Sequence, residues 1–178
     1  MKISLNELRK TMKIDLPNGQ IKYKLFLAGI KLKSVVEKGK KLKDIITVEV
    51  TKIEKHADAD KLVVTQCSDG ENTYQVVTAA TNLEEGVIVP LCLPGGKLID
   101  GTKIKETTIR GMDSYGMYCS KEELGLAEKA DGILILDKKV SLGVNYIEYA
   151  KLQDMIIELE DQGNEAESMQ KVMAIIKA

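Results

Sequence analysis

Arg110 stands in a stretch of sequence where several side-chain types suited to holding a phosphate occur together. Gly111, Ser114 and Gly116 follow it closely. A guanidinium offers a planar fork of donors that matches phosphate oxygens, glycines permit close backbone approach, and a serine adds a hydroxyl contact. We therefore predict that residues 110–120 form a binding surface. The structural alternative is that Arg110 pairs with a carboxylate of its own domain.

Three lysines flank this stretch and extend the predicted surface. If residues 102–111 form a strand, Lys103 and Lys105 share one of its faces, because side chains alternate along a strand, and Lys97 precedes them. Residues 97–110 hold four basic and two acidic residues, a net charge of +2. A phosphate-facing patch and a lysine-rich edge that discourages strand aggregation both fit this pattern.

The sequence shows no pattern for catalysis, a cofactor or a metal. His56, Asp58 and Asp60 lie close together, but His56 is the only histidine of the chain. We expect these residues to cap a turn and close a loop. No nucleophile–base pair or glycine-rich phosphate loop appears, so we predict no catalytic residue, no cofactor and no metal.

Composition and charge narrow the class of protein. A hydrophobic fraction of 44% with 30% charged residues is typical of a globular protein. Three widely spaced cysteines do not indicate disulfides, and the N-terminus lacks the apolar core of a signal peptide. No apolar run is long enough for a membrane span. We expect a reduced cytoplasmic protein with no membrane partner.

The net charge of −1 excludes a uniformly basic nucleic-acid binder. Residues 1–38 hold nine Lys/Arg against three Asp/Glu, residues 39–148 fourteen against eighteen, and residues 149–178 three against six. Any polyanion must therefore meet a local patch rather than the field of the whole protein.

Both ends of the chain predict helices and strands of one small domain. Ser4 and Glu7 form a capping-box pattern before a helix, and a second helix over 21–28 ends at Gly29. Strands are expected over 30–39 and 154–160, a turn over 160–165, and a helix over 165–178. We predict that 1–38 and 149–178 pair into one α/β domain.

The middle of the chain, residues 39–148, predicts a small barrel. The expected elements are strands over 46–56, 61–67, 73–80, 87–96, 102–111 and 133–136, with a short helix over 120–126. Short strands with one helix favour an OB fold, although strand counting alone leaves an SH3-like barrel open. The predicted fold class is mainly β with α/β additions: an OB barrel inserted into the terminal α/β domain.

Several motifs together resemble the tRNA-binding OB domain family. They are HADADKL (56–62), TNLEEG (81–86), LPGGKLIDGTKIK (93–105), IRGMDSYGMYCSKEELGL (109–126) and DGILIL (131–136). The chain is most similar to the start of the bacterial phenylalanyl-tRNA synthetase beta subunit family, since MKISLNEL and residues 27–30 look like the small domain before its OB insertion.

The resemblance implies tRNA as the partner and gives expected roles to Gly116 and Met117 of this surface and to His56 and Asn82 outside it. Gly116 and Met117 shape a loop that RNA approaches, although the structural alternative places Met117 in the core. His56 is a secondary contact, and Asn82 ends an Ala-Thr-Asn run where the family has Ala-Pro-Asn. Only 4% of residues are aromatic, which favours recognition of the shape and backbone of tRNA over base stacking.

Three functions remain open from the sequence. The first is a tRNA-binding module in which the barrel contacts the tRNA backbone. The second is a protein-interaction or assembly module, a synthetase-derived paralogue that no longer binds RNA. Its support is the acidic barrel and the replacement of the family prolines by Ala57 and Thr81. The third is a fragment of a phenylalanine–tRNA ligase, which would make the parent protein an enzyme. A synthetase alpha subunit and a second copy of the chain are the further partners that the resemblance allows.

Overall fold

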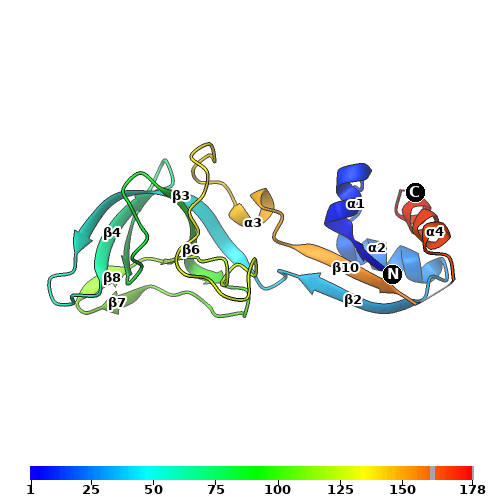
Figure 1. The fold of residues 1–178 in the computed structure, drawn as a ribbon, viewed down its shortest axis with the longest axis horizontal. Helices are drawn as coiled ribbons and strands as arrows, with labels where there is room; N and C mark the ends of the chain where they lie inside the picture. Colours follow the sequence, from blue (N-terminus) through cyan, green and yellow to red (C-terminus); the bar gives the residue numbers. More distant parts are fainter. Residues whose placement is uncertain (161–162, 178) are drawn as a thin grey trace. The chain divides into compact units, whose positions relative to one another are not determined.

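The chain divides into two compact units. The computed structural model describes residues 1–160 and 163–177. One unit, here the terminal unit, consists of Met1–Lys38 and Gln153–Ala178, and the other, the barrel unit, consists of Gly39–Leu152. In Figure 1 the terminal unit is coloured blue and orange to red, and the barrel unit cyan to yellow.

The barrel unit is built on a curled antiparallel sheet of five strands. In the order of the sheet these are β5 (Thr73–Thr78), β4 (Val63–Ser68), β3 (Lys43–Lys55), β6 (Ile88–Lys97) and β9 (Met117–Tyr118). The remaining elements are the hairpin strands β7 (Thr107–Ile109) and β8 (Met112–Ser114) and the short helix α3 (Tyr146–Tyr149).

The long strand β3 makes the sheet curl. Its first half pairs with β6 and its second half with β4. The register with β4 shifts between Val50 and Lys52, and a bulge of this kind bends a strand and increases its twist. One strand can therefore belong to both sides of a barrel. The predicted fold class, a mainly β protein with an OB-like barrel and α/β additions, is confirmed.

Apolar side chains fill the barrel and leave few polar groups inside. Val48, Val89 and Leu91 are completely buried in one cluster, with Tyr118 beside them. The Tyr118 hydroxyl donates to the Thr65 hydroxyl at 2.7 Å, and Thr65 donates to a backbone carbonyl of β5. Burial raises the pKa of Tyr118 far above its ordinary value. These bonds satisfy the polar atoms at the centre of the barrel.

Two predicted elements of the barrel are wrong, and a third is only partly right. Residues 120–126 form a single turn: Ser120 and Glu123 cap each other as in a helix start, but Gly125, at φ +71°, ends it at once. Residues 133–136 carry only isolated bridges. Of the predicted strand 102–111, residues 102–106 carry only an isolated bridge, whereas Thr107–Ile109 form β7. Alternating sequence alone did not reveal that these segments lack a continuous neighbour to pair with.

The terminal unit is an antiparallel sheet covered by helices. Its strands lie in the order β1 (Lys2–Ser4), β10 (Asp154–Leu159) and β2 (Leu32–Lys38). Its helices are α1 (Leu5–Thr11), α2 (Asn18–Leu27) and α4 (Glu165–Lys177). The two chain segments that make up the unit are joined where β1 pairs with β10. Ile3 lies opposite Ile157 in this pairing.

The sequence signals of the terminal unit are largely confirmed. The Ser4 hydroxyl accepts the Glu7 backbone N–H, as the capping pattern predicts. Gly29, after α2, has φ +73°. The apolar face of α4 buries Val172 and Ile176 against the sheet core. Within the predicted turn at 160–165, residues 161–162 lie outside the described residues. In the described part of the chain no helix is long and apolar enough to cross a membrane.

Candidate nucleic-acid interface

Arg110 occupies the tip of a tight hairpin. β7 and β8 pair with Ile109 opposite Met112, so Arg110 and Gly111 form a two-residue loop. Both have positive φ, +51° and +83°, as a loop of this length requires. An arginine in this conformation costs about 1 kcal/mol relative to glycine. Its side chain is exposed, and no ion pair with another described residue occupies it. Arg110 therefore does not pair with a carboxylate of the described residues, which was the structural alternative.

Ser114 anchors this hairpin instead of facing solvent. Its side chain is 3% exposed, and its hydroxyl accepts the Val77 N–H at 3.1 Å and donates to the Gly116 carbonyl at 3.3 Å. The hydroxyl is therefore not available to a phosphate at the surface, contrary to what its position in the sequence suggested. A second bond joins the same strands, from the Tyr115 N–H to the Gln75 carbonyl.

His56 fixes the other side of the hairpin. It is 6% exposed, its Nδ1 accepts the Asp58 backbone N–H at 3.1 Å, and its Nε2 lies 3.3 Å from the Ile109 carbonyl. Because a backbone N–H can only donate, Nδ1 accepts, and Nε2 carries the proton that is shared with Ile109. The expected capping of this loop is confirmed for His56. A direct contact of its ring with RNA remains a prediction.

A groove beside the hairpin brings five of the nine expected residues together. Its volume is about 470 Å³. The expected residues that line it are Lys103, Lys105, Ser114, Gly116 and Met117. The lining also includes Leu62, the last three residues of β5 and Ala79 beyond it.

Lys103 and Lys105 share one side of their segment although it is not a continuous strand. Ile104 between them is buried, and its backbone exchanges two hydrogen bonds with Gly95 and Gly96 of β6. This attachment turns the two exposed lysines to the groove. Lys97 forms a β-bridge with Lys103 and is also exposed, outside the groove lining.

Gly116 is required by packing against β6. A β-carbon there would lie 2.8 Å from the Cys92 carbonyl oxygen and 2.9 Å from Leu91 Cδ1, and its φ is +137°. Met117 is half-buried: it pairs with Cys92 and packs against the barrel core while it lines the groove. Both residues shape the groove wall through their position in the barrel.

Asn82 lies apart from this groove. Its side-chain amide donates to the Ile133 carbonyl at 2.8 Å and accepts the Ile133 N–H at 3.1 Å. The amide thus clamps the loop at Gly132, where a β-carbon would meet it at 2.6 Å. This loop borders another hollow that contains Lys121 and Lys129.

Tyr115 lies inside the predicted surface 110–120, but the sequence did not single it out as a contact. It follows the anchoring Ser114 and is 39% exposed. Strand alternation places both neighbours of Ser114, Asp113 and Tyr115, on the face opposite to it, and both are exposed. The sequence alone did not show that Ser114 is the buried residue of the three.

The remaining chemistry of the barrel is structural. Burial raises the pKa of Cys67 to about 11 and that of Cys92 to about 12. Cys119 is also buried, and its pKa is raised well above the ordinary value. These thiols are poor nucleophiles. Within residues 1–160 and 163–177, no cluster of three His, Cys, Asp or Glu side chains is arranged to hold a metal.

The chain resembles curated beta subunits over nearly its full length. It is 40% identical over 163 residues to the phenylalanine–tRNA ligase beta subunit of Leptospira biflexa, which covers 91% of this chain and 20% of that protein. For the corresponding subunit of Clostridium tetani the identity is 34% over 174 residues, 97% of this chain and 22% of that protein. The chain spans about a fifth of the length of these curated relatives.

A solved structure and a family model each match part of the chain. The MetRS related protein from Pyrococcus horikoshii has 20% sequence identity and a TM-score of 0.44, covering 58% of this chain and 88% of that one. That overlap is too limited to support the fold, which stands on the strand order. Residues 45–145 match the family described as "Putative tRNA binding domain". Because the match covers more than half of the chain, this protein belongs to the tRNA-binding domain family.

Proposed function

We propose that the chain binds tRNA at the barrel groove and at the adjoining Arg110 hairpin, mainly through phosphates and sugars. The observation that carries this proposal is the grouping of Lys97, Lys103, Lys105 and Arg110. All four are exposed, and no ion pair within the described residues neutralises them. Unpaired cations around one groove, in a domain of this family, match the phosphate backbone of RNA.

The anchoring of the hairpin supports a fixed geometry for these contacts. Ser114 and His56 hold the two strands of the hairpin from opposite sides. Arg110 is therefore held at its place before RNA arrives, which lowers the ordering cost of binding. In this proposal Ser114, Gly116 and Met117 position the surface, and the lysines and Arg110 contact RNA.

Recognition of shape fits this surface better than reading of bases. Tyr115 is the one large aromatic among the described barrel residues near the groove that is exposed. One aromatic ring stacks a single base at most. We expect similar affinities for different tRNAs and a steep loss of affinity with salt.

We further propose that the module works in the cytoplasm beside a synthetase alpha subunit. The support is the likeness to ligase beta subunits over about nine tenths of the chain. That the chain is part of a phenylalanine–tRNA ligase, which would be the enzyme, belongs to the same proposal. The alternative considered from the sequence, a barrel that has lost RNA binding, gains no support from the described structure or from the relatives.

The test is binding of labelled total tRNA over a series of salt concentrations. Four phosphate contacts predict that log Kd rises with log salt with a slope of about 3. Arg110→Ala and the double variant Lys103→Ala/Lys105→Ala should weaken binding of all tRNAs alike and reduce the slope by about 1 for each charge removed.

Lys52→Ala is the matched control, because Lys52 is an exposed barrel lysine that is already paired with Glu54 at 2.9 Å. Its loss should leave affinity and slope nearly unchanged. Absence of binding at low salt, or equal loss in the control, would reject the proposed surface.

A further inference from the structure

Helix α2 of the terminal unit exposes a continuous apolar face. Tyr23, Phe26 and Leu27 are 62%, 73% and 64% exposed, and their spacing places them on one side of the helix. The opposite side is anchored by Ile21 and Leu25, both completely buried. Phe26 is the only phenylalanine of the chain, and clustered exposure of large apolar side chains marks a surface that binds a partner.

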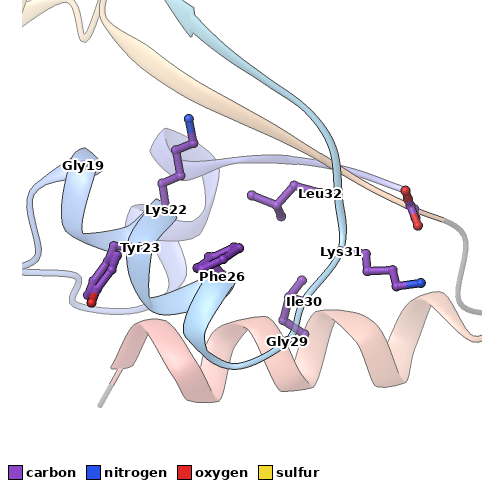
Figure 2. A pocket seen from close by; sticks show the side chains of 9 residues that line it. Gly19, Lys22, Tyr23, Phe26, Gly29, Ile30, Lys31 and Leu32 are labelled. Carbon is purple, nitrogen blue, oxygen red and sulfur yellow. The ribbon is translucent and has the colours of Figure 1, made fainter.

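This face borders a groove of about 650 Å³. Figure 2 shows Phe26 between Tyr23 and the segment 30–32, with the ammonium groups of Lys22 and Lys31 on different sides of it. The groove therefore has an apolar floor and cations at its rim.

The groove is held in shape by the end of α2. The Gly29 N–H donates to the Phe26 carbonyl and the Ile30 N–H to the Leu25 carbonyl, both at 3.0 Å. This is the paired bonding of a Schellman ending, and the φ of +73° at Gly29 completes it. Since Ile30 also packs on the core of the unit, the wall opposite the helix face is fixed and needs no ordering on binding.

The charge around the groove selects the partner. Residues 18–32 contain three lysines and no carboxylate. Lys22 and Lys31, which line the groove, make no ion pair with another described residue. The one acidic residue in the lining is Glu160. A complementary partner has apolar side chains flanked by acidic ones.

We propose that this groove, lined by Tyr23, Phe26, Ile30 and Leu32, docks an acidic amphipathic helix of a separate partner protein. A helix that presents apolar residues at positions i, i+3, i+4 and i+7 can insert them against this floor, while its carboxylates meet Lys22 and Lys31. The docking is distinct from tRNA binding, which the barrel residues carry.

RNA and a second copy of the chain fit the groove less well. Of the four apolar side chains named above, only Tyr23 and Phe26 can stack on bases, and Ile30 and Leu32 cannot. A second copy that met this face symmetrically would place Lys22 and Lys31 against the same lysines.

The experiment uses the full chain and two fluorescein-labelled helical peptides of about 18 residues, long enough to form a helix in a groove. Both carry leucines at the four spaced positions, one with flanking glutamates and the other with flanking lysines. Fluorescence anisotropy should give at least tenfold tighter binding of the acidic peptide. Phe26→Ala and Tyr23→Ala should each weaken it about tenfold, and Lys22→Gln/Lys31→Gln should remove most of its salt dependence.

Controls separate this groove from general exposure and charge. Tyr149→Ala removes another aromatic side chain that is 57% exposed, and Lys13→Gln removes a terminal-unit lysine that is paired with Asp15. Neither should change peptide binding, and thermal melting checks that all variants fold. Measuring tRNA binding with the same variants should show no change, which keeps a failure here distinct from a failure of the barrel surface.

Several results would overturn the proposal. These are equal binding of the two peptides, binding that survives Phe26→Ala, a single-stranded oligouridine that binds the groove in place of the acidic peptide, and sedimentation that shows a dimer abolished by Phe26→Ala.

Discussion

The barrel unit and the terminal unit both present unpaired lysines, but the side chains between the lysines differ. Around the barrel groove, Lys103 and Lys105 flank a buried Ile104, and the nearby polar groups of Ser114 and His56 are bonded to backbone. In the α2 groove, Lys22 and Lys31 lie beside the exposed ring of Phe26. Cations beside buried apolar side chains and a fixed backbone suit phosphates, whereas cations around exposed apolar rings suit an acidic helix. The two surfaces do not differ in the sign of their charge. They differ in whether the apolar side chains beside the lysines are buried or exposed.

The largest expected effect compares a glycine from each unit. Gly116→Ala brings a β-carbon to 2.8 Å from a backbone carbonyl at positive φ and should cost about 3 kcal/mol of unfolding free energy. Gly29→Ala also has positive φ, but no atom lies within 4 Å of its β-carbon, so we expect about 1 kcal/mol. Denaturant titration of both variants measures the difference, and equal losses would show that conformation rather than packing dominates at Gly116.

The next effect tests whether the two surfaces are independent. Lys103→Gln/Lys105→Gln/Arg110→Gln should weaken tRNA binding at least about tenfold at low salt, with acidic-peptide binding retained. Lys22→Gln/Lys31→Gln should do the reverse. Both ligands are titrated against both variants at one salt concentration. Loss of tRNA binding in the α2 variant as large as in the barrel variant would merge the two surfaces into one.

A smaller effect is expected at Ser114. Ser114→Ala leaves the buried Val77 N–H without its acceptor and should cost about 1–2 kcal/mol. Because the hydroxyl holds the hairpin, tRNA affinity should fall modestly while the salt slope stays at its parent value. A reduced slope would mean that Ser114 contacts a phosphate directly, and a salt titration of this variant distinguishes the two roles.

The smallest expected effect is on the pKa values of two carboxylates, Asp69 of the barrel unit and Glu158 of the terminal unit. The backbone N–H of Asn72, with further bonds from Glu71 and Tyr74, holds the pKa of Asp69 far below its usual range. Hydrogen bonds from Lys33 and Ser34 lower the pKa of Glu158. Since both folded-state pKa values are lowered, each contributes stability above the ordinary carboxyl pKa, and this is lost as pH falls through the folded value.

Salt should separate these two carboxylates. High salt screens the exposed Lys33–Glu158 pair, so the pKa of Glu158 should move back toward its ordinary value. The pKa of Asp69 should change little, because its main partners are backbone N–H groups. Carbon-detected NMR titrations at low and high salt measure both. A salt response of Asp69 as large as that of Glu158 would contradict this assignment of causes.

Local patterns predicted the elements whose partners lie nearby in the sequence. The Ser4 cap, the end of α2 at Gly29 and the apolar face of α4 were readable because capping bonds and helical periodicity act over a few residues. The same reasoning failed at residues 120–126, where a cap was present but Gly125 ended the helix after one turn. It also missed α3, whose four residues are too few to show a period.

The sequence by itself determined which residues are charged, which glycines permit tight turns, and the motif that places the chain in its family. Only the tertiary structure decided which of those residues are available. Ser114 and Arg110 stand four positions apart in one motif, yet one is buried by its bond to β5 and the other is exposed at a hairpin tip. Availability depends on strands distant in the sequence, because burial and hydrogen bonding come from neighbours in space.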